Sequence, residues 1–185
     1  MHLTHKDGFE TRHPGEPSLL MRREIEARIA VPLIQAFTEK MGRERALAVA
    51  TEVIKSLACA AGRETARKLG ANNMAALAKV VREVWSPENA LEVKILEETD
   101  RKLSFDVTRC AYAELYEKLG VKEFGSCLSC NRDASFAEGF SPRLKLQRTQ
   151  TIMEGAPSCD FRFSLECRWR GCRQRAAFRP SICLL

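Results

Sequence analysis

Thiol, carboxylate and guanidinium groups that could do chemistry gather in one stretch of the sequence, from Val107 to Phe163. They are Cys110, Cys130, Cys159, Asp133, Asp160 and Arg148. All six fall on predicted turns, on the ends of predicted elements or on a sheet face. Reactive groups are usually carried on loops held by a rigid scaffold, so this pattern indicates a chemical site. The alternative is that Cys110 and Cys159 are small buried hydrophobic residues, as free cysteines often are.

Cys130 and Asp133 lie about one helical turn apart and are near enough to serve one substrate. A cysteine hydrolase needs a thiolate, a proton shuttle and donors for the developing negative charge. The three histidines all lie within the first 13 residues. An acid or base role therefore falls to Asp133, Asp160 or Glu138, with a pKa raised in a dry pocket. The alternative for Asp133 is a loop aspartate that accepts backbone N–H bonds.

Cys110 is predicted to be the most reactive thiol of the chain. Thr108 can cap a helix that Gly120 closes, which places Cys110 in the first turn. The partial positive charge of a helix N-terminus lowers a thiol pKa, and Arg109 acts in the same direction.

Arg148 is a candidate anchor for a substrate carboxylate. It lies on a predicted strand beside Thr149 and Thr151. A guanidinium with hydroxyl neighbours suits bidentate, charge-assisted binding of a carboxylate. A solvated strand arginine is the alternative.

A structural zinc site is a further alternative for the cysteines. Cys127 and Cys130 form a short C-x-x-C pair, and the chain has no second pair at similar spacing. Cys110 and Cys159 could complete four thiolate ligands only if the fold brings them together. We therefore predict no cofactor, with zinc through Cys110, Cys127, Cys130 and Cys159 left open.

Composition limits the class of protein. The chain has 185 residues, 45% of them hydrophobic and 29% charged, which fits one globular domain. Much of the net charge of +6 comes from the arginines after Phe161, so nucleic acid is not an expected partner. No apolar run approaches the ~20 residues that cross a bilayer, and the start has no signal core. We expect a cytoplasmic protein with reduced thiols and a small-molecule partner; a homo-oligomer stays open.

Periodicity predicts three domain parts: a mobile arm (1–17), one folded domain (18–165) and a basic tail (166–185). Helices are expected from Ser18 to Gly42, with a kink or break at Pro32, from about 43 to 69, and from about 73 to 84. The faces predicted to point inward are Ile25, Ile29, Leu33 and Phe37 on the first helix and Leu47, Val53, Ile54, Leu57 and Ala61 on the second.

From Ala90 the period changes to two. Two alternating runs around the turn at residues 99–101 predict a hairpin, and two further strands are expected at 143–152 and 160–165. Residues 121–142 lose periodicity and are predicted to be a structured loop with at most one short helical turn. The fold class is therefore α+β: N-terminal helices packed on a four-stranded antiparallel sheet in a single domain.

Three motifs read V-T-R-C-A-Y-A-E-L-Y-E-K-L-G, C-N-R-D-A-S-F-A-E-G-F-S-P and R-T-Q-T-I-M-E-G-A-P-S-C-D-F-R-F. In this order the chain, from about residue 20 to 165, resembles the L-2-amino-thiazoline-4-carboxylic acid hydrolase family. The namesakes of that family open a cyclic isothiourea, a thiazoline ring, to a carbamoylated cysteine on the way to L-cysteine. The resemblance implies a site at the motif positions Cys110, Cys130, Asp133, Arg148, Cys159 and Asp160.

The sequence thus predicts a hydrolase that opens a small cyclic amidine or isothiourea ring. Cys130, Asp133 and Cys110 are the expected catalytic residues; Arg148, Cys159 and Asp160 are the expected substrate-binding residues, with Asp160 on the ring amine. Attack by a thiolate and attack by an Asp133-activated water both stay open.

The competing function is a non-catalytic module that binds a small ligand or a metal. The pattern G-x-x-x-C-x-F, from Gly155 to Phe161, resembles small-ligand-binding domains of the vinyl-reductase type.

Overall fold

The computed structural model describes residues 17–166; the predicted arm and tail fall almost entirely outside this range. The α-helices of this range are α1 (Leu19–Met41), α2 (Arg43–Leu69), α3 (Met74–Val80), which a π-helical turn (Val81–Trp85) continues, α4 (Ala111–Lys118) and α5 (Arg132–Phe140). The strands are β1 (Leu91–Glu98), β2 (Lys102–Cys110), β3 (Leu144–Gln147) and β4 (Cys159–Leu165). The predicted α+β class is confirmed. Within the described range, no helix combines the length and the hydropathy needed to span a membrane.

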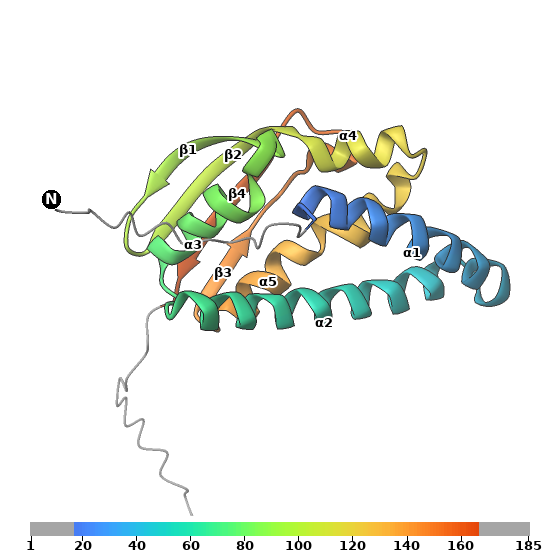
Figure 1. Ribbon diagram of the computed structural model, residues 1–185, viewed down its shortest axis with the longest axis horizontal. Coiled ribbons are helices and arrows are strands. Elements are labelled where there is room, and N and C mark those ends of the chain that lie inside the picture. Colours follow the sequence, from blue (N-terminus) through green and yellow to red (C-terminus); the bar gives the residue numbers. More distant parts are fainter. Residues whose placement is uncertain (1–16, 167–185) are drawn as a thin grey trace, which may run out of the picture.

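The four strands form one antiparallel sheet in the order β1-β2-β4-β3. Helices α3 and α5 pack against one face of this sheet, and the long α2 runs along the outer side of α5 (Figure 1). The other face carries polar residues such as Asp106 and Arg162, whose ion pair of 2.7 Å is partly exposed. The alternation of residues along each strand therefore buries one face and leaves the other hydrated.

Local signals place several element ends. The Ser18 hydroxyl accepts the N–H of Met21 at 3.1 Å and caps α1, and Asn73 caps α3 through the N–H of Ala76 at 2.9 Å. Gly70 ends α2 in the left-handed conformation that glycine adopts at no steric cost. Pro32 does not split α1, because the helix continues through it.

Four strands were predicted and four are found in the described range, but the third was predicted too long. Strands β1 and β4 lie close to the expected ranges, and β2 begins as expected but continues to Cys110, through the residues predicted to start a helix at Thr108. The third strand was expected to reach residue 152, but β3 ends at Gln147. Beyond it, the backbone N–H groups of Thr149 and Gln150 donate to the Asp160 carboxylate, at 2.9 and 2.8 Å, and not to a strand ladder.

The prediction of a loop for residues 121–142 is wrong, because the segment folds as short helical turns followed by α5. The turns are Lys122–Phe124 and Ser126–Cys130. Helix α5 is held by an unusually close contact with α2. A Cβ on Gly62 would lie 2.2 Å from the carbonyl oxygen of Phe136, and a Cβ on Gly139 would lie 2.0 Å from that of Cys59. The contact between the two backbones therefore requires glycine at both positions.

The predicted inward faces of α1 and α2 are also wrong. Ala27, Val31 and Ile34 are the buried residues of α1, whereas the row at Ile25, Ile29, Leu33 and Phe37 is exposed. On α2, Ile54 is buried as expected, but Val53 and Leu57 are exposed. Both helices carry apolar residues on more than one side, so periodicity alone could not identify the side that meets the core.

The buried side chains form two clusters. The first lies between the sheet and the helices and includes Phe105, Phe163 and Trp85. The second lies among α1, α2 and α4 and includes Ile34 and Tyr116. The two clusters meet at residues packed against both of them, among them Leu19, Leu91 and Cys110. This boundary is where the site described below lies.

The glycine contact predicts an unusual mutational result. Gly62→Ala should destabilise the protein by about 1–3 kcal/mol through overpacking, although alanine is the better helix former. The measurement is the free energy of unfolding by urea denaturation. Ala60→Gly, at an exposed position of the same helix, is the control and should lower stability by about 1 kcal/mol through propensity alone. A stabilised Gly62→Ala would contradict the packing described.

Candidate active site

A pocket of about 110 Å³ lies at the boundary between the two hydrophobic clusters. Its walls are mainly apolar and include Trp85, Phe136 and Phe161 from the first cluster and Met153 from the second. At about 10–15 Å³ for each water-sized group, the pocket holds roughly 7–11 such groups, the size of one small ring with a substituent. The polar and thiol-bearing residues of its wall are Arg23, Cys110, Tyr112, Ser129, Cys130, Arg132, Asp133, Arg148 and Cys159.

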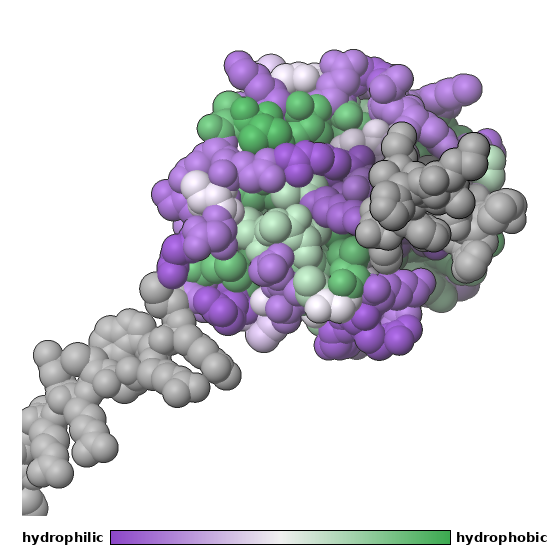
Figure 2. Space-filling model, turned by 60° about the vertical axis from the view of Figure 1, so that its left-hand side comes forward, coloured by the Kyte–Doolittle hydropathy of each residue, from purple (hydrophilic) through white to green (hydrophobic). Residues whose placement is uncertain are grey.

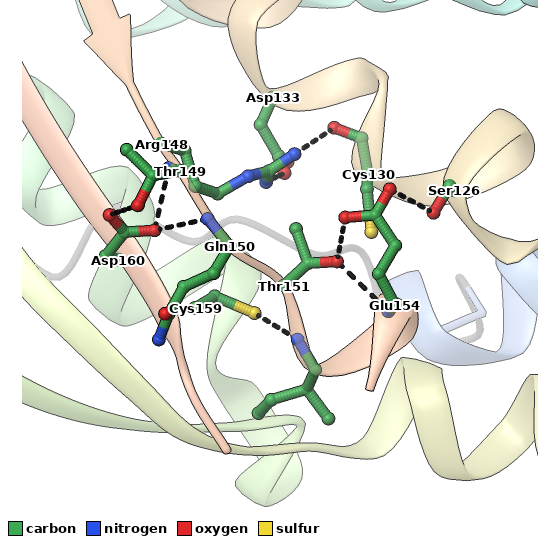
Figure 3. A network of polar contacts seen from close by, with 11 residues as sticks. Ser126, Cys130, Asp133, Arg148, Thr149, Gln150, Thr151, Glu154, Cys159 and Asp160 are labelled. Atoms are coloured by element: carbon green, nitrogen blue, oxygen red, sulfur yellow. Dashed lines mark hydrogen bonds and ion pairs between the residues drawn. The ribbon is translucent and has the colours of Figure 1, made fainter. Parts of the chain in front are cut away.

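Asp133 and Arg148 form an ion pair in the wall of this pocket (Figure 3). Asp133 lies in the first turn of α5, and Arg148 follows the last residue of β3. The two side chains are only 23% and 15% exposed. Arg148 also donates to the carbonyl oxygen of Cys130 at 3.0 Å, and its guanidinium carbon lies 5.1 Å from the centre of the Phe161 ring. One arginine thus joins α5, β4 and the turn that carries Cys130.

Burial raises the pKa of the Asp133 carboxyl, because water is largely excluded from it, and the neighbouring Arg148 offsets this effect only in part. A carboxylate of this kind is more basic than an exposed one.

The three pocket cysteines come from three different elements. Cys110 ends β2, Cys130 ends the turn before α5, and Cys159 begins β4. Burial raises the pKa of each thiol: that of Cys110 to about 11, that of Cys130 further because Asp133 lies nearby, and that of Cys159 as well. The Sγ of Cys159 also accepts the backbone N–H of Ile152 at 3.2 Å. At neutral pH the pocket therefore presents neutral thiols.

The prediction of a lowered pKa for Cys110 is wrong. Cys110 is the last residue of β2 with extended backbone, and α4 begins only at Ala111. Desolvation of the sulfur outweighs hydrogen bonds from the backbone of Ala113 and Tyr112. Arg109, which was expected to lower this thiol pKa further, instead donates to the Glu114 carboxylate and to the carbonyl oxygen of Asn89.

Five of the six predicted site residues thus line one pocket, and Asp160 does not. Its carboxylate accepts bonds from the backbone and hydroxyl of Thr149 and the backbone of Gln150, and it turns away from Asp133 (Figure 3). Desolvation of the carboxylate alone would raise the pKa of Asp160, but these hydrogen bonds together outweigh desolvation and lower it. In the structure, Asp160 shapes the segment that carries Arg148.

The thiols do not form a metal site in the described part of the chain, which contains no group of three or more His, Cys, Asp or Glu residues placed to hold an ion. Cys127 points to α2, where its sulfur lies 3.3 Å from the hydroxyl oxygen of Thr51. Cys130 instead lines the pocket. The four proposed thiolate ligands therefore do not converge.

Sequence reasoning missed a second charged group at the pocket. Arg23 and Arg132 both donate to the same oxygen of Glu26, each at 2.7 Å, and both line the cavity. Arg132 also holds the carbonyl oxygen of Leu128 at 2.7 Å. The i, i+3 spacing of Arg23 and Glu26 was visible in the sequence, but their pairing with a residue more than a hundred positions away was not.

A buried hydroxyl lies beside this charged group. Tyr116 is fully buried, and its hydroxyl has no hydrogen-bond partner among the described residues. Burial raises the pKa of Tyr116 to about 12, although Arg23 and Arg132 act against the shift. The phenol is therefore a neutral donor at physiological pH.

The charges at the pocket do not cancel. Arg23, Arg132 and Arg148 are positive, and Glu26 and Asp133 are negative. When both carboxylates are ionised, the excess of one positive charge at a mostly apolar pocket favours a small ligand with one negative charge.

The fold and site define an α+β protein with a small pocket of thiols, one carboxylate and arginines. The sequence matches the profile of the L-2-amino-thiazoline-4-carboxylic acid hydrolase family over residues 22–163, and the chain belongs to this family. No protein of curated function matches it. Among solved structures, the chain is similar to a trafficking protein particle complex subunit 3 from Naegleria fowleri covalently bound to palmitic acid. The TM-score is 0.49 at 12% identity, over 79% of this chain and 96% of that chain.

The raised thiol pKa values predict slow alkylation that depends steeply on pH. The rate at Cys110, followed by mass spectrometry of iodoacetamide-treated protein, should rise about tenfold per pH unit at neutral pH and level off only near pH 11. Cys59, a half-buried cysteine of α2 that does not line the pocket, serves as an internal reference in the same sample. A rate at Cys110 that levels off below pH 8 would show that the thiol is activated.

The partly buried ion pair predicts a single-mutant effect that a second substitution relieves. Arg148→Met leaves the Asp133 charge unpaired and should cost about 1–3 kcal/mol at pH 7, whereas Asp133→Leu/Arg148→Met should regain most of this loss. The exposed pair of Arg28 and Glu24 provides the control, and Arg28→Met should cost below about 0.5 kcal/mol.

The pH dependence of Arg148→Met adds a second test. The pKa of Asp133 is higher in the folded than in the unfolded protein. The contribution of Asp133 to folding stability is therefore full below the unfolded pKa and is lost as the pH rises through the folded pKa. Without Arg148 the folded-state pKa of Asp133 rises further, so Asp133 becomes protonated and neutral as the pH is lowered towards 5. The loss of folding stability in Arg148→Met should therefore be smaller at pH 5 than at pH 7. An equal loss at both pH values would contradict burial of the charge.

Proposed function

We propose that the protein hydrolyses a small cyclic amidine or isothiourea that carries one carboxylate, such as L-2-amino-thiazoline-4-carboxylate. Family membership gives the hydrolase class. Two features of the pocket support this kind of substrate: its size, which suits a single ring, and its excess positive charge beside apolar walls. The product would be a carbamoylated cysteine, which provides a route to L-cysteine.

Arg148 is the proposed anchor of the substrate carboxylate. A guanidinium has five N–H donors, and among the described residues Arg148 uses one on Asp133 and one on Cys130. The remaining donors can bind a carboxylate while the ion pair stays intact. Arg23 and Arg132 increase the attraction for an anion. Asp160 would take part only if the segment of Thr149 and Gln150 released it.

The proposed chemical step is the addition of water to the amidine carbon, with Asp133 as the general base. Asp133 takes one proton from water, whose oxygen bonds to the carbon held between sulfur and two nitrogens, and passes this proton to the ring nitrogen. Cleavage of the carbon–sulfur bond, with the proton of the added hydroxyl transferred through Asp133 to sulfur, gives an N-carbamoyl cysteine. Cleavage of the bond between the carbon and the ring nitrogen would instead give an S-carbamoyl cysteine. In both cases one water is consumed.

The choice of water attack over covalent attack by a thiol rests on a contrast between Asp133, which can act as a base, and the neutral thiols around it. Asp133 has a raised pKa and lies at the pocket wall, so it is a stronger base than an exposed carboxylate. Cys110, Cys130 and Cys159 all have raised pKa values. A neutral thiol is a weak nucleophile, so covalent attack by Cys130 needs a proton acceptor first. Asp133 is again the group that could accept this proton.

The experiment is a turnover screen of thiazoline and hydantoin-like carboxylates with purified protein and two variants. Asp133→Asn should lower kcat by about 10²- to 10⁴-fold. Cys130→Ser should retain turnover within about tenfold, because no covalent bond to sulfur is needed. The matched control is Asp106→Asn, an arginine-paired aspartate on the open face of the sheet, and it should leave kcat unchanged.

Other outcomes would redirect the proposal. An inactive Cys130→Ser together with a rapid-quench thiol adduct would replace water attack by covalent catalysis. Saturable binding of these carboxylates with no turnover of any of them would replace the hydrolase by a ligand-binding module.

A further inference from the structure

Large apolar side chains are exposed in one region of the molecule above all. Of the eleven large hydrophobic residues that are exposed in the described structure, nine lie on α1 and α2. The other two, Ile95 and Leu96, lie on β1. Figure 2 brings the sheet end of the molecule forward, and there the surface is largely hydrophilic with separate hydrophobic areas.

The exposed residues follow a regular spacing on each helix. On α1 they recur every four residues, and on α2 three of them do the same: Met21, Ile25, Ile29, Leu33, Phe37 and Met41, then Val49, Val53 and Leu57. Rows of residues four apart form the ridges that interlock in the commonest class of helix packing. We call these two rows the α1–α2 ridges. Each helix thus presents the surface with which helices pack.

The opposite side of α1 is already used. Ala27, Val31 and Ile34 are buried in the second hydrophobic cluster. A helix that is apolar on both sides is normally buried on both sides. The two helices pack against each other and form a hairpin that extends beyond the other helices at the end of the molecule away from β1 and β2 (Figure 1). The hairpin is therefore sterically open to another molecule.

We infer that the α1–α2 ridges form a two-fold interface with a second copy of this chain. The middle of the α1 ridge (Ile29, Leu33 and Phe37) and the α2 ridge, both about half exposed, would form the apolar centre of this interface, with the charged residues beside them as its polar rim. The hairpin also carries charges of both signs beside the ridges, as in the pair of Glu24 and Arg28. Mixed charge suits a surface that meets its own copy. A membrane-binding helix would instead have a polar face rich in Lys and Arg.

The test is the oligomeric state of the full chain, measured by sedimentation velocity over a range of protein concentrations. The wild-type protein should sediment as a dimer at micromolar concentration. Ile29→Glu and Leu57→Glu, one on each ridge, should each weaken dimerisation by at least about 30-fold. Leu96→Glu is the matched control: Leu96 is 49% exposed on β1, Ile29 is 62% exposed, and the control should remain dimeric.

Circular dichroism separates loss of the dimer from loss of the fold, because each variant should keep its helical spectrum. Since both substituted side chains are already exposed, neither ridge variant should lose monomer stability. A monomeric wild-type protein would overturn the proposal, as would a dimer that persists in both ridge variants. A wild-type monomer that dimerises only after removal of residues 167–185 would show instead that the chain's own C-terminal segment covers the ridges.

Discussion

The site depends on an ion pair, Asp133 with Arg148, which is partly buried at the boundary between two hydrophobic clusters. A carboxylate and a guanidinium are costly to remove from water, and each becomes tolerable there only because the other is present. The pair fixes the start of α5 to the end of β3 and, through the carbonyl of Cys130, to the preceding turn. The same desolvation raises the pKa of Asp133 and of the thiols around it. One electrostatic arrangement thus links the packing of the domain to the chemistry of its pocket.

A packing constraint makes this ion pair possible. Helix α5 approaches α2 so closely that a Cβ at Gly62 or Gly139 would overlap a backbone carbonyl group. With α5 seated there, its first turn faces the sheet at the point where β3 ends. Two further groups hold the neighbouring turns. Glu154 accepts from Ser126 and Thr151 (Figure 3), and Arg132 donates to the carbonyl oxygen of Leu128. The turns beside the proposed base are therefore held by several side-chain hydrogen bonds.

The sequence predicted the hairpin and the last strand well, because their alternation was clean, but it made the third strand too long. Alternation at Leu103, Phe105 and Val107 gave the buried face of β2, and Phe161 and Phe163 did the same for β4. Sequence reasoning failed to predict α5. This helix is stabilised by close packing on α2 at Gly62 and Gly139, and no local sequence pattern reveals that contact. Sequence reasoning also failed for the faces of α1, which is apolar on two sides.

The site was predictable as a group of residues but not in its electrostatics. The motifs grouped Cys110, Cys130, Asp133, Arg148 and Cys159, and the structure places all five in the wall of one pocket; their catalytic and binding roles stay predictions. The lowered pKa expected for Cys110 was wrong because a thiol pKa depends on burial, which spacing does not report. Arg23 and Arg132 were missed because they converge only through Glu26 in the folded chain.

The central claim is that the pocket contains one carboxylate more basic than normal. The most direct measurement is a pH titration of the Asp133 side chain by carbon NMR of aspartate-labelled protein, with Asp133→Asn to assign the signal. We predict a midpoint clearly above the ordinary aspartate value of about 4. A midpoint at or below that value would show that Arg148 outweighs burial, and it would contradict the role of Asp133 as the base.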